Sequence, residues 1–290
     1  MPNVTATTAA RFIDEWWNPE LNHGVEFDIV IMDLFSDWSS KMRGSGDILH
    51  VPARHNLTAN TKSAGTDATP EAITETQQNF TVSTHQIVAQ TIEDFAEIMS
   101  RYDIRGGFTH DASYALARAM DVAAAGLFDD NTLQTVGVLS AELTDDNLIR
   151  AWQYGKDSAA KGIAKGVVSP ACWAGLLKIE KFTQALFNGD TGGKALHEAQ
   201  LGKIYNATIY QSQLTVGTAP NSSGHLWWGD HFFKVIKRPP TMHQWYSPLA
   251  VAWVITSDTV YGAFELQEAD EAAAATTTAR LHGVRLQTLK

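Results

Sequence analysis

The chain of 290 residues has a single cysteine, Cys172, so it can form no intrachain disulfide. Its longest apolar run, from Leu249 to Ile255, is far too short to span a membrane as a helix, and we expect no membrane partner. The opening MPNVTATTAARF lacks the basic and then apolar segments of a signal peptide. These absences predict a protein that is made in the cytosol.

Positive charge is also scarce. The 22 Lys and Arg residues stand against 32 Asp and Glu residues, which gives a net charge of −10 and a pI near 5.4. The densest cationic stretch is Lys156, Lys161 and Lys165, whose spacing is typical of one solvated face. Because proteins that grip nucleic acid usually carry a basic patch, we expect no direct, and hence no sequence-specific, DNA binding. An acidic surface can still lie close to packed DNA without adhering to it.

Motifs for catalysis or cofactor binding are missing as well. The sequence contains no G-x-S-x-G, no G-x-G-x-x-G and no HExxH. The loop from Gly189 to Lys194 only superficially resembles a phosphate-binding loop. Asn188 stands where its first glycine belongs, and Ala195 replaces the hydroxyl that would bind magnesium.

One histidine-rich stretch and the lone thiol are the remaining chemical candidates. His225, Asp230, His231 and His243 could hold a metal, but no two have the i, i+4 spacing of a helical metal site. Cys172 follows Pro170 at an expected helix start, where a thiolate is favoured, yet its apolar setting predicts an inert core thiol. We therefore assign no catalytic, cofactor-binding or metal-binding residue. We expect that the protein needs no cofactor and is not an enzyme.

Aromatic residues are absent from a long polar arm. From Arg54 to Gln78 there is no Phe, Tyr or Trp, and only Leu57 and Ile73 are large and aliphatic. Ordering such a segment costs ~1–2 kcal/mol per residue in backbone entropy, with little apolar burial to offset it. Compact domains rarely contain loops of this kind. Either the arm is disordered, or a neighbouring copy of the chain supplies its contacts.

The flanks of this arm have the pattern of a long hairpin. Ile48 to Val51 is β-prone and is expected to stop at Pro52, while Phe80, Val82 and Thr84 alternate with polar residues on the return leg. The two legs with an irregular tip predict a projecting loop.

Helices and strands are mixed along the rest of the chain without a regular βαβ repeat, which predicts an α+β fold. Apolar spacing predicts helices over 7–17 and 92–99, and alternation predicts a strand over 25–31. A long Ala-rich helix is expected to begin after Gly106-Gly107, or to kink there, and to end at Gly126. The further expected elements are a helix capped by Thr144, a strand before Ser169, a helix capped by Ser169, and strands near 204–210, 249–256 and 284–289.

Three segments, taken in this order, resemble a known family. They are GDILHVPARHNLTANTKSAGTDATPEAITET, IEDFAEIMSRYDIRGGFTHDASYALARAMD and LGKIYNATIYQS. Together with the order of arm, hairpin, long helix, mixed region and terminal strand, they resemble the major capsid proteins of tailed bacteriophages, which share the HK97-like capsid fold. The resemblance covers roughly Gly44 to the C-terminus.

The resemblance implies a division of the chain. Residues 1–43 would form an N-terminal arm and residues 44–86 the extended E-loop, which reaches over an adjacent subunit. Residues 87–140 and 251–290 would form the peripheral domain with its long spine helix, and residues 141–250 the axial domain. The Trp-rich stretch from Leu226 to Trp245 is unusual for an axial domain and suggests a family-specific insertion or contact.

It also implies a function. The chain would assemble as pentamers and hexamers, through the E-loop and the N-terminal arm, into the icosahedral head that encloses phage DNA. It would be assembled in the host cytoplasm and reside in the virion. Partners would include a portal, a separate scaffolding protein and, as a further candidate, a decoration protein. A separate scaffolding protein is expected because no long scaffolding segment precedes the arm. Lys62 lies in the loop, but nothing identifies a crosslinking partner, so we predict no crosslink.

Two other functions stay open at this point. The same fold could build an encapsulin-like, non-viral shell that encloses an enzyme, because a fold alone does not separate cargo from genome. A metal-dependent hydrolase using the stretch from His225 to His243 is the alternative from another class.

Overall fold

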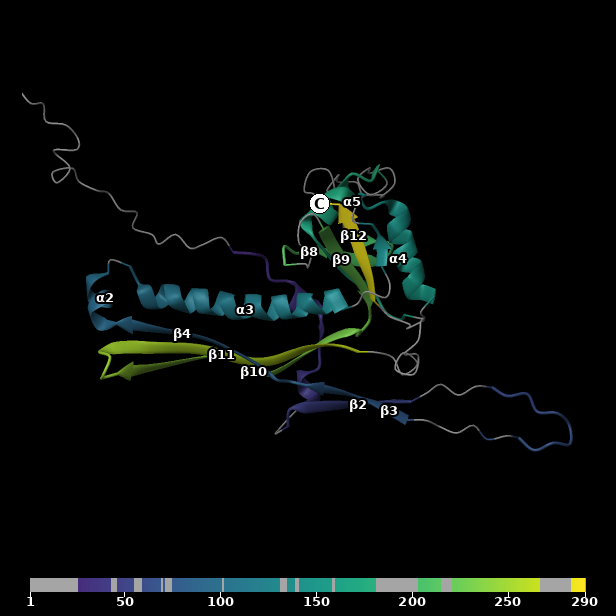
Figure 1. Ribbon diagram of the computed structural model, residues 1–290, viewed down its shortest axis with the longest axis horizontal. Helices are drawn as coiled ribbons and strands as arrows, with labels where there is room; N and C mark the ends of the chain where they lie inside the picture. The colour runs from purple at the N-terminus through teal and green to yellow at the C-terminus, as the bar shows by residue number, and fades with distance from the viewer. Residues whose placement is uncertain are drawn as a thin grey trace, which may run out of the picture.

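The computed structural model describes residues 26–42, 46–54, 59–68, 70, 75–100, 102–130, 135–138, 141–157, 160–180, 203–214, 221–266 and 283–289. The helix expected over 7–17 and the loop from Gly189 to Lys194 lie outside the described residues. The described part is an elongated molecule in which a long sheet with one long helix carries a smaller, six-stranded sheet near one end (Figure 1).

The long sheet has four strands in the order β1-β10-β11-β4. Their bounds are β1 (Ser36–Asp37), β4 (Thr84–Glu93), β10 (Phe232–Ser247) and β11 (Ala252–Glu265). Strands β10 and β11 form an antiparallel pair whose register shifts around Arg238, next to Pro239 and Pro240. Proline has no amide hydrogen to donate to a ladder, so the irregularity falls where the two prolines stand.

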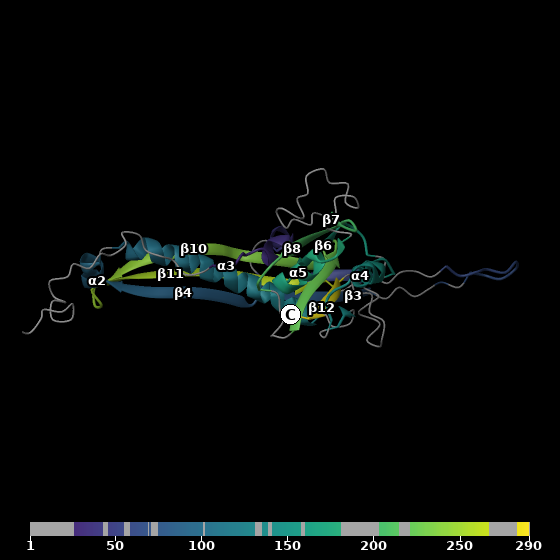
Figure 2. The same ribbon diagram turned by 90° about the horizontal axis from the view of Figure 1, so that it is seen from above.

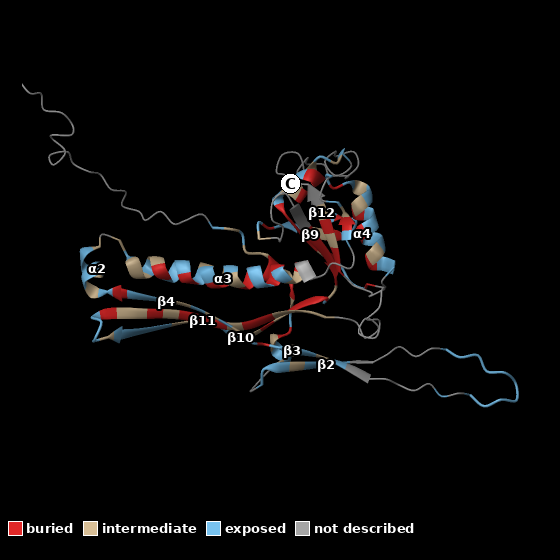
Figure 3. Cartoon of the chain, viewed as in Figure 1, coloured by how far each residue is buried: buried red, intermediate tan, exposed pale blue. Residues whose placement is uncertain are grey.

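Helix α3 (Ile104–Asp130) lies along one face of this sheet (Figure 1). Its buried residues Phe108 and Ala112 pack against Ile92 and Ile255 of the strands. Figure 3 shows that α3 carries buried positions along its length and exposed positions between them. The long Ala-rich helix is confirmed, but both of its predicted ends are wrong. The helix begins before Gly106, whose amide donates to Asp103 Oδ1 at 3.0 Å, and it continues past Gly126. A capping carboxylate thus offsets the low helix propensity of the glycine pair.

The segment from Ile92 to Met99 is only partly helical. Strand β4 continues to Glu93, and a short helix α2 (Asp94–Met99) follows it. The backbone of residues 84–93 pairs with β11 along its whole length, and these ladder hydrogen bonds override the local helical spacing.

The second sheet has the order β5-β12-β9-β6-β8-β7. Its strands are β5 (Thr135–Gly137), β6 (Ala164–Val168), β7 (Lys203–Ile204), β8 (Ala207–Gln211), β9 (Asn221–Trp228) and β12 (Gly283–Leu289). Helices α4 (Asp145–Asp157) and α5 (Pro170–Leu177) cover it and share one apolar core with it. The predicted cap of α5 is confirmed, because the Ser169 hydroxyl accepts a hydrogen bond from the Cys172 amide at 3.2 Å. Helix α4 begins directly after Thr144, as expected.

The third unit is a two-stranded hairpin of β2 (Ile48–Arg54) and β3 (Glu75–Thr81). It projects from the rest of the molecule in both views (Figures 1 and 2), which confirms the hairpin expected from its two flanks. The predicted stop at Pro52 is wrong. Strand β2 continues through it to Arg54, because an isolated two-stranded ribbon has free edges where a proline is tolerated.

Two strands pair differently from the division expected above. Strand β10, placed with the axial residues 141–250, joins β11 and β4 in the long sheet. Strand β12, placed with the peripheral residues 251–290, lies between β5 and β9 in the six-stranded sheet. The Trp-rich stretch therefore belongs to two sheets, with Leu226 to Trp228 in one and the residues from Phe232 onward in the other. Pairing between distant strands leaves no local signal in either sequence.

Among the described residues, no helix is both long enough and apolar enough to cross a membrane.

Candidate assembly surfaces

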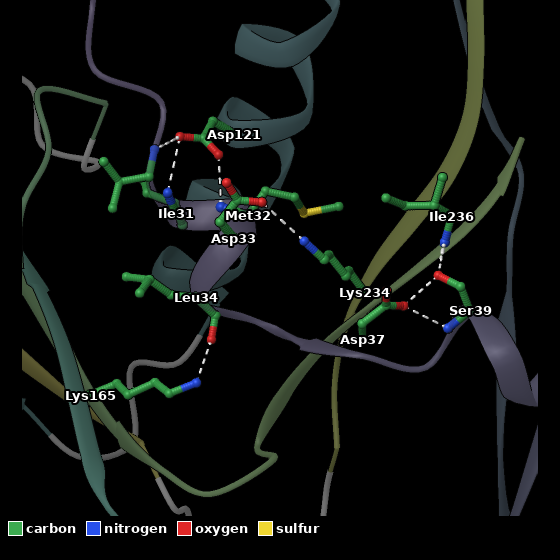
Figure 4. Close-up of polar contacts among 11 residues, drawn as sticks. Ile31, Met32, Asp33, Leu34, Asp37, Ser39, Asp121, Lys165, Lys234 and Ile236 are labelled. Atoms are coloured by element: carbon green, nitrogen blue, oxygen red, sulfur yellow. Dashed lines mark hydrogen bonds and ion pairs between the residues drawn. The ribbon is translucent and has the colours of Figure 1, made fainter. Parts of the chain in front are cut away.

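Residues 26–42, which we call the N-terminal strap, bind to the body of the same chain. Figure 4 shows Asp121 of α3 beside the strap, with its carboxylate turned toward Ile31 and Met32. Its carboxylate accepts backbone hydrogen bonds from Val30 at 2.8 Å, Ile31 at 3.0 Å and Met32 at 2.7 Å. Asp121 is fully buried, and these hydrogen bonds stabilise a carboxylate charge that would otherwise lie without partners in an apolar setting. The strand predicted over 25–31 is wrong for this reason, since its last residues bend into helix α1 (Ile31–Leu34) around one carboxylate.

The strap also bonds to both sheets. From the six-stranded sheet, Lys165 Nζ donates to the carbonyl oxygen of Leu34 at 2.9 Å. From the long sheet, Lys234 Nζ lies 3.2 Å from Asp33 Oδ1, and the amide of Ile236 donates to Ser39 Oγ at 2.9 Å (Figure 4). Residues 30–34 of the strap therefore contact α3, the long sheet and the six-stranded sheet.

A cluster of aromatic rings lies where the strap, α3 and the two sheets meet. We call it the aromatic joint, and it consists of Phe35, Phe128, His225, Trp227 and Phe232. Phe35 stacks on Phe232 with ring centroids 5.1 Å apart, and Trp227 meets Phe35 edge-on at 6.0 Å. All five side chains are buried. Because the five residues come from four separate segments, their packing sets how the two sheets are oriented.

The hairpin is anchored at its base and exposed at its tip. Phe80 of β3 meets Phe233 of β10 edge-on at 5.0 Å, and Trp38 of the strap stacks on the same Phe233 at 4.2 Å. Beyond the strands, every described residue of 59–68 is exposed, Lys62 included. Among the described residues, the body of this chain therefore holds the hairpin at its base, while residues 59–68 at the tip stay exposed.

The far end of the long sheet carries a group of exposed apolar side chains, which we call the distal patch. It consists of Phe95, Ile98, Met99, Trp245, Tyr246, Leu249 and Val251. Ile98 is 80 % exposed and Phe95 is 70 % exposed. Helix α2 is held to the β10–β11 turn by the Asp94 amide, which donates to Val251 O at 3.2 Å, and by the Tyr246 hydroxyl, which donates to Asp94 Oδ2 at 3.0 Å. Exposed apolar side chains gathered at one end of a sheet are typical of interaction sites.

A charged cluster lies on the sheet face opposite α3. Asp258 Oδ2 lies 3.0 Å from His85 Nε2 and 2.9 Å from Arg238 Nη1, and its Oδ1 accepts from Thr241 at 3.1 Å. The hydrogen bond with His85 is the main cause that lowers the pKa of Asp258. Thr241 and Arg238 act in the same direction, against the loss of hydration, which raises it.

The candidate metal ligands are not brought together. His225 lies in the aromatic joint, His231 pairs with Glu265 at 2.9 Å, and His243 lies 2.8 Å from Arg238 Nη2. Asp230 accepts a hydrogen bond from Ser36. Within the described ranges, no three His, Cys, Asp or Glu side chains are grouped as metal ligands. The hydrolase alternative thus has no site among these residues.

Cys172 matches the expectation of an inert core thiol. It is fully buried, and this burial raises its pKa, which disfavours the reactive thiolate.

The sequence indicated neither Asp121 nor the distal patch. Asp121 follows Arg118 by three residues in an Ala-rich helix, a spacing typical of a surface ion pair, so its backbone partners 89 to 91 residues away left no trace. The apolar residues of α2 gave a clear signal, but their spacing is equally typical of a buried helix face.

No protein-family model matches the chain, and no curated protein matches it. Solved structures do. A structure from Mycobacterium phage Che8 superposes with a TM-score of 0.79 at 17 % identity, covering 95 % of this chain and 97 % of that one. The head structure of Helicobacter pylori bacteriophage KHP40 superposes with a TM-score of 0.75 at 11 % identity, covering 100 % of this chain and 99 % of that one. The capsid structure of cyanophage P-SCSP1u superposes with a TM-score of 0.73 at 15 % identity, covering 98 % of this chain and 94 % of that one.

The chain has the HK97-like capsid fold. The similarity extends over nearly the whole of both chains in each case, so it includes the hairpin, the long helix and both sheets. The fold expected from the sequence is thereby confirmed.

Proposed function

We propose that the chain is the major capsid protein of a tailed bacteriophage, which assembles with copies of itself into the icosahedral head around phage DNA. The projecting hairpin is the observation that carries this proposal. Its strands leave the body of the molecule and end in a polar, exposed tip that gains nothing from being held there by this chain alone. Contacts with an adjacent copy give the projection a physical reason.

In this proposal the three units of the fold have separate tasks. The hairpin is the E-loop, the long sheet with α2 and α3 is the peripheral domain, and the six-stranded sheet with α4 and α5 is the axial domain. The distal patch is a further contact between copies, placed at the end of the long sheet away from the hairpin (Figure 1). Several weak contacts in different directions add up when a shell closes.

The role is structural rather than enzymatic, and no cofactor is required for it. The described part of the N-terminal arm, the strap, binds its own subunit, so we assign the contacts between copies to the hairpin and the distal patch. A portal and a separate scaffolding protein remain proposed partners. A net charge of −10 suits a shell that encloses DNA without gripping it.

The test shortens the hairpin without disturbing its strands. Residues 55–74 are replaced by Asn-Gly, which joins Arg54 to Glu75 by a tight turn and keeps the pairing of β2 with β3. We expect a folded chain by circular dichroism that no longer forms closed shells in negative-stain electron microscopy and sedimentation velocity. Closed shells from the shortened chain would refute the proposal.

The encapsulin-like alternative is separated by particle content. Shells from an infected host should hold DNA and carry a portal. Shells that hold an enzyme instead would favour the non-viral compartment.

A further inference from the structure

His225 is a buried histidine whose ring nitrogens have no hydrogen-bond partner among the described residues. It lies on β9 and is fully buried, yet neither Nδ1 nor Nε2 is bonded. The indole nitrogen of Trp227, two residues along the same strand face, is likewise buried without a partner. Buried polar atoms are bonded in most proteins, so an exception of this kind calls for a physical reason.

The position of His225 gives one. Its ring stacks on Phe128 of α3, with centroids 4.9 Å apart and planes 4° from parallel, and meets Phe232 of β10 edge-on at 5.4 Å. The imidazole thus fills a place in the aromatic joint as a neutral, flat ring. A phenyl ring could fill the same place without leaving two nitrogens unbonded.

The groups around His225 oppose a positive charge on it. Arg285 of β12 stands directly opposite in the register, and His231 precedes β10, whereas Val167 faces it from β6. The carboxylates of the elements packed against the joint are already engaged, since Glu265 pairs with His231 and Asp121 of α3 accepts the amides of the strap. A proton on His225 would therefore meet like charges and aromatic rings, and neither ring nitrogen has a hydrogen-bond partner among the described residues to receive it.

We propose that His225 makes the aromatic joint sensitive to acid, so that protonation loosens the packing between the six-stranded sheet and the long sheet with α3. The joint opens locally, which exposes the backbone of β9 and the last turns of α3, while the pairing of β4 with β11 in the long sheet persists. The inference concerns the folded chain alone and does not depend on the proposed function.

The direction of the effect follows from the surroundings. Burial, with the charges of His231 and Arg285, places the pKa of His225 well below its ordinary value. The opened joint would expose the ring and let it take up a proton near its usual pKa of about 6.5. The closed joint is therefore favoured above about pH 6.5 and loses stability as the pH falls below it.

The first experiment follows hydrogen–deuterium exchange of the unmodified full-length chain between pH 7 and pH 5, corrected for the chemical exchange rate. Protection of residues 224–228 and 124–128 should fall about tenfold per pH unit below pH 6.5. Protection of residues 86–92 and 252–258, in the long sheet, should not. Constant protection at the joint would overturn the proposal, and so would an equal loss in both places, which indicates general acid unfolding.

Two variants identify the group that titrates. His225→Phe keeps a flat ring in the joint and should reduce the acid effect to less than about twofold, because no proton can bind. His85→Gln alters a histidine contact outside the joint, the one with Asp258, and should leave the acid effect as in the unmodified chain. An unchanged response in His225→Phe, or a lost response in His85→Gln, would overturn the assignment. If His225→Phe does not fold, the exchange of the unmodified chain still decides whether the joint opens.

Discussion

Asp121 Oδ1 accepts a 2.7 Å hydrogen bond from the backbone amide of Met32, 89 residues earlier in the chain. The same carboxylate also accepts from Val30 and Ile31, so one side chain orders residues 30–32 of the strap. A buried carboxylate with several amide donors acts as an anchor only while its partners are present.

Replacing this carboxylate should detach the strap. Asp121→Ala leaves buried amide donors unbonded, each costing about 1–3 kcal/mol, so we expect a loss of roughly 3 kcal/mol in the free energy of unfolding. Urea denaturation measures this loss in the free energy of unfolding. Asp111→Ala on the same helix is the control, because that side chain is 67 % exposed and its loss should change stability by about 0.5 kcal/mol or less. Equal effects of the two variants would mean that Asp121 does not hold the strap.

Two helical glycines should respond to alanine in opposite directions. A Cβ on Gly155 of α4 would overlap the indole ring of Trp228, which is buried and held in the core of the six-stranded sheet. A Cβ on Gly126 of α3 would meet nothing within 4 Å. We expect Gly155→Ala to cost about 1–3 kcal/mol and Gly126→Ala to stabilise the chain by up to about 1 kcal/mol. Thermal unfolding of the two variants compares them, and a stabilised Gly155→Ala would show that α4 does not lie so close to the sheet.

The distal patch should matter for assembly and not for folding. The double variant Ile98→Ser and Leu249→Ser removes two exposed apolar side chains, so the unfolding free energy should change by about 0.5 kcal/mol or less. Shell yield by sedimentation velocity should fall markedly. Val122→Ser, which alters an exposed apolar residue of α3 outside the patch, serves as the control. If the double variant assembles as fully as the control, the patch is not a contact between copies.

The sequence by itself determined the elements that depend on local chemistry. The hairpin follows from two β-prone legs around a segment too polar to be buried, and α5 follows from Ser169 and Pro170 at its start. The long helix follows from its alanines. The mixture of helices and strands predicted the α+β class, and the resemblance of three segments and of the element order to a known family implied the HK97-like fold.

Only the tertiary structure decided what lies next to what. Strands β10 and β12 joined the sheets opposite to those expected, because a strand's own residues do not specify its partner. The end of the predicted strand over 25–31 passes into helix α1 instead, because a carboxylate on a distant helix binds the amides of Val30 and Ile31. His225 stood among candidate metal ligands in the sequence, and the fold placed it among aromatic rings. Long-range contacts, which add their free energy only after the chain has closed, settled each of these points.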